Sequence, residues 1–276
     1  MNFIKTIVLC LLFFSLLNAK NVNSIVFAPL PTKLKSNIIN DFNPLISYLE
    51  KKLNIEIEYK FYQNYKDIID AIKNKEVDIA YLGPLPYIAL YSEYKGVKPL
   101  VSFKEKNKKH NYRCILAKFK TSNIDISKNV KIALTQPLST CGYFMTNILL
   151  KKQYDKSLEN FLYSYEMSHE NSLLSLVKGT HILAGAKEDI AKKYESLGVS
   201  IIKRSILLPG FTLVGNKNTI SDNLSSKIKK TLLNIDTKTL STLKKGRYGF
   251  SLATQKDYGN LKVNINKIPF VGNINE

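Results

Sequence analysis

The sequence predicts an α/β protein with two lobes and a ligand cleft between them. First, short apolar strands alternate with amphipathic helices, a rhythm that favours a mostly parallel sheet. Second, this rhythm occurs twice, on either side of a lysine-rich turn at residues 104–111, without detectable sequence repetition. Third, Gly83 and Ser139 each stand where a strand passes into a helix, one in each half. Because ligands of open α/β sheets bind at such places, we expect the two halves to share one ligand.

The first half of the chain shows the alternation clearly. The expected elements are a strand at 25–28, a helix at 38–53, a strand at 55–62, a helix near 65–74, a strand at 77–83 and a helix at 86–94. Apolar residues recur at helical spacing in the first helix, and they alternate with polar residues in the second strand. Gly83 and Pro84 end the last strand and open its helix, since proline suits the first turn.

The second half repeats this order. The expected elements are strands at 112–118 and 130–134, a helix from Ser139, a strand near 161–167, a helix at 170–178 and a strand at 181–186. From about residue 221 the chain is helical again, over 221–235 and 237–245, before a polar tail. Each half therefore has enough strands for a sheet of its own.

The amino terminus has the pattern of a secretory signal. One early lysine is followed by about a dozen apolar residues and then by Asn18 and Ala19. We expect cleavage after Ala19, so that residues 1–19 are a signal peptide and the mature protein is exported. Later stretches fall short of the roughly 18 apolar residues that a membrane span needs.

The charge of the chain is strongly positive. It has 41 Lys and Arg against 22 Asp and Glu, a formal net charge of +19 at pH 7. Such a surface attracts anions and speeds their arrival, although a lysine-rich solvated surface without special function is an equally good explanation. The sequence contains no helix-turn-helix, zinc-finger or RNA-binding motif, so we expect no nucleic-acid partner.

Cysteine and histidine chemistry is sparse. Cys114 and Cys141 are too few for a disulfide scaffold, and the sequence leaves open whether they form a single bridge. Cys141 near His169 would have the ingredients of an activated thiolate, but no third orienting group is identifiable. A metal site could draw on His110, Cys114, Cys141, His169 and His181. Of these, only His110 and Cys114 have a familiar metal-ligand spacing. We therefore expect no enzymatic activity, no metal and no cofactor.

The stretch Ser139-Thr140-Cys141-Gly142 opens a helix with two hydroxyls, a thiol and a glycine. One capping residue would satisfy the first turn, so an ordinary N-cap at Ser139 or Thr140 is one interpretation. The amino end of a helix also carries partial positive charge and unpaired N–H groups. An anion site is therefore the second interpretation.

Four stretches together resemble a known family. KNKEVDIAYLGPLPYI, QPLSTCGYF, MSHENSLLSLVKG and GRYGFSLATQKDYGNL are similar, in order and spacing, to periplasmic substrate-binding proteins of phosphate, phosphite and phosphonate ABC transporters, over residues 24–262. The resemblance implies a type II periplasmic binding protein fold, with lobe one at 20–106 plus 214–276 and lobe two at 107–213. It also implies a monomer in the periplasm that binds a small anion and delivers it to an ABC permease. A sensor of the same fold, presenting another anion to a membrane receptor, is the alternative.

The resemblance also assigns site residues. In that family a Ser-Thr-Ser run holds the phosphorus oxyanion, and Ser139, Thr140 and Cys141 match it here. The other matches are His169 against the anion, Tyr65 and Tyr112 along the cleft, and Glu188 at the place of a carboxylate that meets an amino group. Gly83 and Pro84 are expected at the site for a different reason, since they stand where a strand passes into a helix in the other lobe. For Tyr112 the alternative is strand packing, and for Glu188 a solvated helix start.

Two departures from the family pattern bear on the ligand. Cys141 replaces a hydroxyl and is a weaker donor. Phe211, in ILLPGFTLVG, stands where the family has an aspartate that accepts a hydrogen bond from a protonated phosphonate or phosphite. Without that acceptor we expect weak binding of phosphite and aminoethylphosphonate, and better binding of an anion with an apolar portion.

Overall fold

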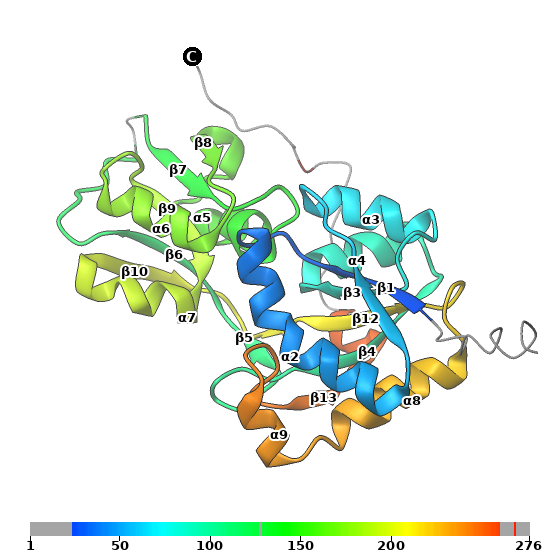
Figure 1. Ribbon diagram of the computed structural model, residues 1–276. Helices are drawn as coiled ribbons and strands as arrows, with labels where there is room; N and C mark the ends of the chain where they lie inside the picture. The colour runs from blue at the N-terminus through cyan, green and yellow to red at the C-terminus, as the bar shows by residue number, and fades with distance from the viewer. Residues whose placement is uncertain (1–23, 127–128, 260–267, 269–276) are drawn as a thin grey trace, which may run out of the picture.

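The computed structural model describes residues 24–126, 129–259 and 268, and its described part forms two lobes side by side (Figure 1). The α/β class predicted from the sequence is confirmed, with one sheet in each lobe. The signal peptide expected at residues 1–19 lies outside the described residues, as does most of the polar tail.

The sheet of the first lobe has six strands in the order β13-β4-β12-β3-β1-β2. These strands are β1 (Ser24–Pro29), β2 (Glu56–Tyr59), β3 (Ile79–Leu82), β4 (Val97–Phe103), β12 (Thr212–Asn216) and β13 (Phe250–Leu252). β1 pairs in parallel with β2 and β3, whereas β12 is antiparallel to both β3 and β4, and β13 is antiparallel to β4. The expectation of a mostly parallel sheet is wrong, because the strands β4, β12 and β13, which the sequence patterns did not reveal, all join it antiparallel.

The sheet of the second lobe has five strands in the order β10-β6-β9-β7-β8. They are β6 (Cys114–Phe119), β7 (Lys131–Leu134), β8 (Leu162–Tyr165), β9 (Leu183–Lys187) and β10 (Val199–Arg204). β7 is parallel to β8 and β9, while β6 is antiparallel to β9 and β10. This sheet is therefore mixed as well.

A two-stranded ribbon joins the lobes. It pairs β5 (Asn111–Tyr112) with β11 (Leu208–Pro209), and Figure 1 labels β5 between the two sheets. The single strand expected at 112–118 is thus divided, because Tyr112 pairs with Leu208 in the ribbon while Cys114 pairs with Lys187 in the second sheet. The chain passes between the lobes here on both its outward and its return path.

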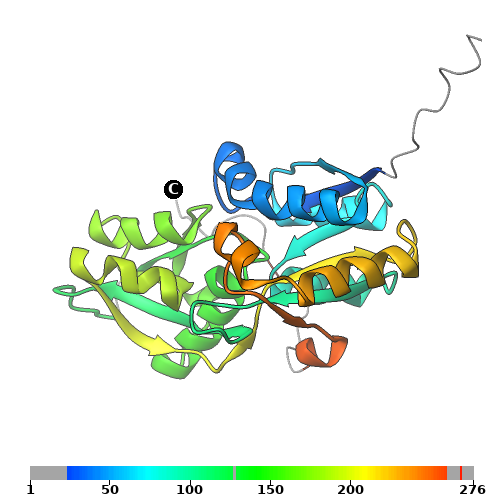
Figure 2. The ribbon, with the colours of Figure 1, turned by 60° about the horizontal axis from the view of Figure 1, so that its bottom comes forward.

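Helices cover both sheets (Figures 1 and 2). In the first lobe they are α2 (Lys35–Leu53), α3 (Tyr65–Lys73), α4 (Pro84–Glu93), α8 (Asp222–Leu233), α9 (Thr237–Thr242) and the turn η4 (Gln255–Tyr258). In the second lobe they are η1 (Thr140–Met145), which continues into α5 (Thr146–Tyr154), then η2 (Leu158–Asn160), α6 (His169–Val177), α7 (Glu188–Ala191) and η3 (Lys192–Leu197).

The last helix is shorter than the expected 237–245. It ends at Thr242 because Leu243 has extended backbone, with φ −77° and ψ 142°. The following segment turns back toward α2, where the Lys245 N–H donates to the Asp41 carbonyl at 3.0 Å. Gly246 completes the turn with φ 86°, a conformation that suits glycine.

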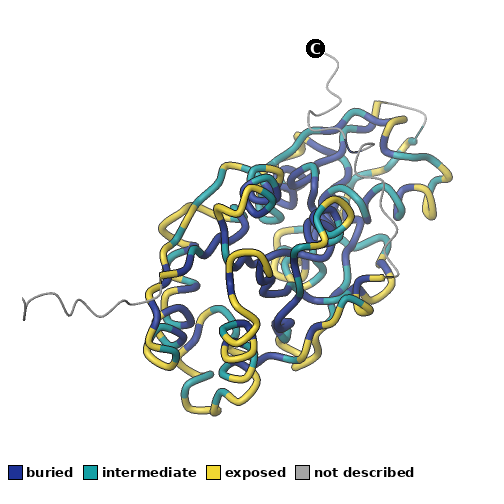
Figure 3. Tube along the Cα trace, turned by 90° about the vertical axis from the view of Figure 1, so that its right-hand side faces the viewer, coloured by how far each residue is buried: buried dark blue, intermediate teal, exposed yellow. Residues whose placement is uncertain are grey.

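Each sheet is buried on both faces, and in Figure 3 the buried parts of the trace lie mainly in the interior of the molecule. In the first lobe, α2 and α8 contribute to one core cluster, and α3 and α4 contribute to the other. The helices of the described residues include none that is both long and apolar enough to cross a membrane.

Candidate functional site

A cavity of about 200 Å³ lies between the lobes. That is several times the volume of about 30 Å³ that a water molecule occupies in the liquid, so it suits a small ligand. Of the residues predicted for the site, those lining the cavity are Tyr65, Gly83, Tyr112, Ser139, Thr140, Cys141, His169 and Phe211. Pro84 and Glu188 are not among its lining residues.

Three helices begin at this cavity. α4 starts beside Gly83, η1 beside Ser139 and α6 beside Ser168, and all three of these capping residues line the cavity. The amino end of each helix carries partial positive charge. The convergence of three such ends favours an anionic ligand.

The predicted cradle, residues 139–142, forms the start of η1. The Ser139 hydroxyl accepts a hydrogen bond from the Gly142 N–H at 3.0 Å, so Ser139 is an N-cap. The N–H groups of Thr140 and Cys141, the first two residues of the helix, have no acceptor within it and remain for a ligand. Glycine is needed at 142, because a Cβ there would lie 1.9 Å from Thr135 Oγ1.

The Thr140 hydroxyl connects the two lobes. It accepts a hydrogen bond from the Leu85 N–H at 3.0 Å. Pro84 and Pro86 flank Leu85 and have no N–H, so the first turn of α4 contributes its electric field but no further backbone donor. Pro86 lines the cavity, whereas Pro84, which was expected at the site, does not.

His169 is the first residue of α6, and its ring meets the cavity. Its Nδ1 is buried without a hydrogen-bond partner, and so is Oγ1 of Thr135 on the neighbouring strand end. Burial lowers the pKa of His169 to about 3, and the positive charge of Lys187 contributes to the same shift. The ring is therefore neutral near pH 7 and carries one N–H donor. We call Thr135, residues 139–142 and His169 the cradle wall.

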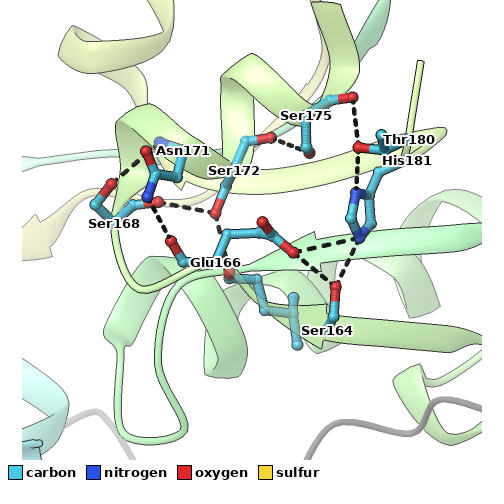
Figure 4. Close-up of polar contacts among 9 residues, drawn as sticks. Ser164, Glu166, Ser168, Asn171, Ser172, Ser175, Thr180 and His181 are labelled. Atoms are coloured by element: carbon cyan, nitrogen blue, oxygen red, sulfur yellow. Dashed lines mark hydrogen bonds and ion pairs between the residues drawn. The ribbon is translucent and has the colours of Figure 1, made fainter. Parts of the chain in front are cut away.

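A hydrogen-bond network fixes the segment that presents His169 (Figure 4). Ser168 caps α6 by accepting from the Asn171 N–H at 3.1 Å, and Asn171 Nδ2 donates to the Glu166 carbonyl at 3.0 Å. Behind it, Ser164 Oγ donates to Glu166 Oε1 at 2.7 Å and lies 2.7 Å from His181 Nε2. His181 thus serves this network and is not part of the cavity.

Aromatic rings form the facing side of the cavity. Phe211 stacks on Tyr81 with ring centroids 5.1 Å apart and lies 5.8 Å from Tyr112. Tyr65 and Tyr112 are buried, and burial raises the pKa of both phenols. Tyr112 also lines the cavity, so strand packing does not fully describe it.

Two lysines that sequence reasoning missed complete this side. Lys187 Nζ lies 5.0 Å from the Tyr112 ring centroid, and Lys245 Nζ lies 4.4 Å from that of Tyr81. Lys187 ends the strand that leads to α7, a position that could have signalled it. Lys245 belonged to an apparent helix, so no local signal marked it. We call Tyr81, Tyr112, Phe211, Lys187 and Lys245 the aromatic wall.

Glu188 has other partners than a ligand. Its Oε1 pairs with Arg204 Nε at 2.9 Å and with Lys192 Nζ at 3.2 Å, and these cations hold the pKa of the carboxyl down against the effect of burial. The resemblance placed Glu188 opposite a ligand amino group. In the structure, Glu188 forms these ion pairs and is not among the residues that line the cavity.

Cys114 and Cys141 form a disulfide, which joins β6 to the cradle. The question that the sequence left open is thereby answered. Cys141 has no S–H to donate, so it contributes only its backbone N–H and apolar surface. The thiolate required for nucleophilic chemistry is absent for the same reason. Among the described residues, no group of three or more His, Cys, Asp or Glu could hold a metal.

Comparison with protein families gives one match across most of the chain. The model for phosphonate periplasmic substrate-binding proteins of ABC transporters covers residues 27–258. The phosphonates-binding periplasmic protein of Escherichia coli is 23% identical over 223 residues, 75% of this chain and 65% of the relative. The phosphate-import protein PhnD of Mycolicibacterium smegmatis is 26% identical over 168 residues, 56% of this chain and 52% of the relative. The chain thus spans about half to two thirds of these two relatives.

Solved structures share the fold. PhnD1 from Prochlorococcus marinus, in complex with methylphosphonate, superposes with a TM-score of 0.72 at 16% identity, covering 86% of this chain and 95% of the other. A binding protein component of an ABC phosphonate transporter from Pseudomonas aeruginosa has a TM-score of 0.71 at 20% identity, covering 86% and 84%. The two-lobed periplasmic binding protein fold predicted from the sequence is confirmed.

Proposed function

This chain belongs to the family of periplasmic substrate-binding proteins of phosphonate ABC transporters, and we propose that it captures a small phosphorus oxyanion between its lobes. The observation that carries the proposal is the cradle wall, where a helix amino end meets two buried polar atoms without partners, Thr135 Oγ1 and His169 Nδ1. Neutral groups of this kind bind an oxyanion through charge-assisted hydrogen bonds. The captured anion is then delivered to a permease in the membrane.

We assign the oxyanion to the backbone N–H groups of Thr140 and Cys141, the Ser139 hydroxyl and the His169 ring. The Ser139 oxygen accepts from Gly142, but its own hydrogen is free to reach the ligand. Tyr65, Tyr112 and Phe211 then enclose the rest of the ligand. The methylphosphonate held by the Prochlorococcus marinus protein and the names of the two curated relatives support this ligand class.

The lobes close around the ligand by hinge motion at the β5–β11 ribbon. We keep the lobe boundaries near residues 106 and 214, noting that β12 already joins the first sheet at Thr212. The bond between Leu85 and Thr140 forms across the closed cleft and breaks on opening. In this proposal the protein is a monomeric periplasmic carrier with residues 1–19 as its signal peptide, and it catalyses no reaction and binds no nucleic acid.

Isothermal titration calorimetry of residues 20–276 tests the proposal. We expect saturable binding of methylphosphonate or phosphate at one site per chain, and no binding of acetate. Small-angle scattering should show compaction at saturation, because closure brings the lobes together. Binding of sulfate or a carboxylate, with no phosphorus oxyanion bound, would overturn the proposal.

A further inference from the structure

Lys245 reaches the cavity from the first lobe, although its neighbours in the chain lie at the surface. Its Nζ lies 4.4 Å from the Tyr81 ring centroid and 5.8 Å from that of Phe211, and the residue is half-buried. Its backbone is held by the hydrogen bond to the Asp41 carbonyl at 3.0 Å. The ammonium is therefore fixed beside Phe211, opposite the cradle wall.

The other lysine of this wall has a carboxylate partner, whereas Lys245 has none. Lys187 Nζ pairs with Glu105 at 2.6 Å, and Lys33, also at the cavity, pairs with Asp41 at 3.0 Å. Within the described part of the chain, Lys245 makes no ion pair. Burial, together with the charges of Lys187 and Lys33, lowers its pKa to about 8, so the ammonium form persists near pH 7 at a cost.

The rest of the cavity is poorly suited to a ligand amino group. Phe211 supplies no acceptor, and Glu188 is occupied by Arg204 and Lys192. Glu170 lines the cavity, but it lies in the first turn of α6, whose positive end offsets its charge. A substituent that extends from the cradle toward Phe211 therefore meets an ammonium.

We propose that the preferred ligand is a phosphorus oxyanion bearing a second acidic group on a short apolar linker, and that Lys245 is the residue that selects it. The proposal rests on the proposed function, since the cradle wall must hold the phosphorus end. The linker lies against Phe211, and the second acid pairs with Lys245. This pairing stabilises a half-buried cation that otherwise lacks a partner, and the pairing is strongest when the cleft is closed.

The competing explanation is that Lys245 only stacks on the aromatic rings. In that case its loss would weaken every ligand alike, through the stability of the aromatic wall. Selective pairing predicts instead that only ligands with the second acid lose affinity. Comparing ligands of similar size within one variant separates these explanations.

The test is calorimetry at pH 7 with phosphonoacetate, propylphosphonate and 2-aminoethylphosphonate, which carry an acidic, a neutral and a basic substituent. The proteins are the parent, Lys245→Gln and Lys245→Arg. The matched control is Lys60→Gln, because Lys60 also lies near an aromatic ring, Tyr62 at 5.8 Å, but lies outside the cavity and, unlike Lys245, pairs with a carboxylate, Glu76 at 2.7 Å.

We expect the parent and Lys60→Gln to bind phosphonoacetate roughly tenfold to a hundredfold more tightly than propylphosphonate, and 2-aminoethylphosphonate most weakly. Lys245→Gln should lose that preference while it still binds propylphosphonate, which also reports that the variant is folded, and Lys245→Arg should keep part of the preference. An unchanged preference in Lys245→Gln, or a parent that prefers the amino ligand, would overturn the inference alone. If the parent binds methylphosphonate or phosphate but none of the three phosphonates, the inference alone is overturned. If it binds none of these five ligands, the proposed function fails and the inference falls with it.

Discussion

The cradle wall and the aromatic wall face each other across one cavity, yet they present opposite kinds of chemistry. The cradle wall offers neutral donors: backbone N–H groups, hydroxyls and a histidine that burial keeps uncharged. The aromatic wall offers stacked rings and two ammonium groups, one of which lacks a carboxylate partner. Neutral donors suit the end of the ligand that all members of the class share, because they bind an oxyanion without requiring a fixed counter-charge.

The difference teaches where selectivity resides. A helix amino end recognises any small oxyanion of suitable shape, so it discriminates little between substituents. In the proposed binding mode, the residues beside Phe211 meet the part of the ligand that varies. The same division explains why the family resemblance identified the cradle, whereas the ligand depends on residues that depart from the family pattern.

The largest effect should follow from releasing the cradle wall from β6. In Cys114→Ser/Cys141→Ser, loss of a bridge across 27 residues should lower the free energy of unfolding by about 3 to 4 kcal/mol, measured by urea denaturation. Reduced parent protein is the control and should match the variant. We expect the preference among substituents to survive in the folded variant, since the aromatic wall is intact. A loss of preference without loss of stability would contradict the division into two walls.

Removal of the cradle hydroxyls should weaken all ligands. In Ser139→Ala/Thr140→Ala we expect a loss of roughly 1 to 3 kcal/mol of binding free energy for each charge-assisted bond, measured by calorimetry. Ser221→Ala is the matched control, because Ser221 caps α8 by accepting from Leu224 N–H at 3.1 Å, as Ser139 accepts from Gly142 N–H at 3.0 Å. If the double variant melted lower but bound as tightly as the parent, capping alone would explain these residues.

A carboxylate in the aromatic wall should reverse its selectivity. Phe211→Asp restores the acceptor that the family has, and it places an anion near two ammonium groups, which lie 5.7 and 5.8 Å from the present ring centroid. We expect affinity for phosphite and 2-aminoethylphosphonate to rise about tenfold to a hundredfold relative to propylphosphonate. Phe211→Leu, which keeps the wall apolar, should show no such gain. Tight phosphite binding by the parent would contradict this account of position 211.

The smallest effect concerns pH and the cradle wall. Folded His169 stays neutral down to about pH 3, whereas an unperturbed histidine takes up a proton near 6.5. The unfolded state therefore binds more protons in that window, and the free energy of unfolding should fall by about 1 kcal/mol between pH 7 and about pH 5.5. The melting temperature should fall by roughly 2 to 4 °C, and His169→Gln should reduce this decrease.

His110→Gln replaces an exposed histidine and is the control for that measurement. His181, whose pKa burial also lowers, accounts for part of the slope that remains in His169→Gln. An identical pH dependence in the parent and in His169→Gln would show that the ring is not held neutral by its surroundings.

The sequence by itself determined the α/β class, the two halves and the position of the cradle. These follow from local information: apolar periodicity defines helices and strands, and hydroxyls before a helical run mark its amino end. Gly83, Ser139, Thr140, His169 and Phe211 were all expected at the cleft, and all line the cavity. Gly83, Ser139 and Thr140 stand where a strand passes into a helix, which short stretches of sequence encode, whereas His169 and Phe211 were expected from the family resemblance.

Only the tertiary structure decided the strand directions, the disulfide and the two lysines of the aromatic wall. β12 enters the first sheet antiparallel between β3 and β4 after a long excursion through the second lobe, and no local pattern records such a pairing. Lys245 reaches Phe211 because α9 ends early and the chain turns back, and Glu188 leaves the cavity because Arg204 on β10 pairs with it. Contacts between residues far apart in sequence depend on packing of the whole chain, so they were beyond the reach of periodicity and spacing.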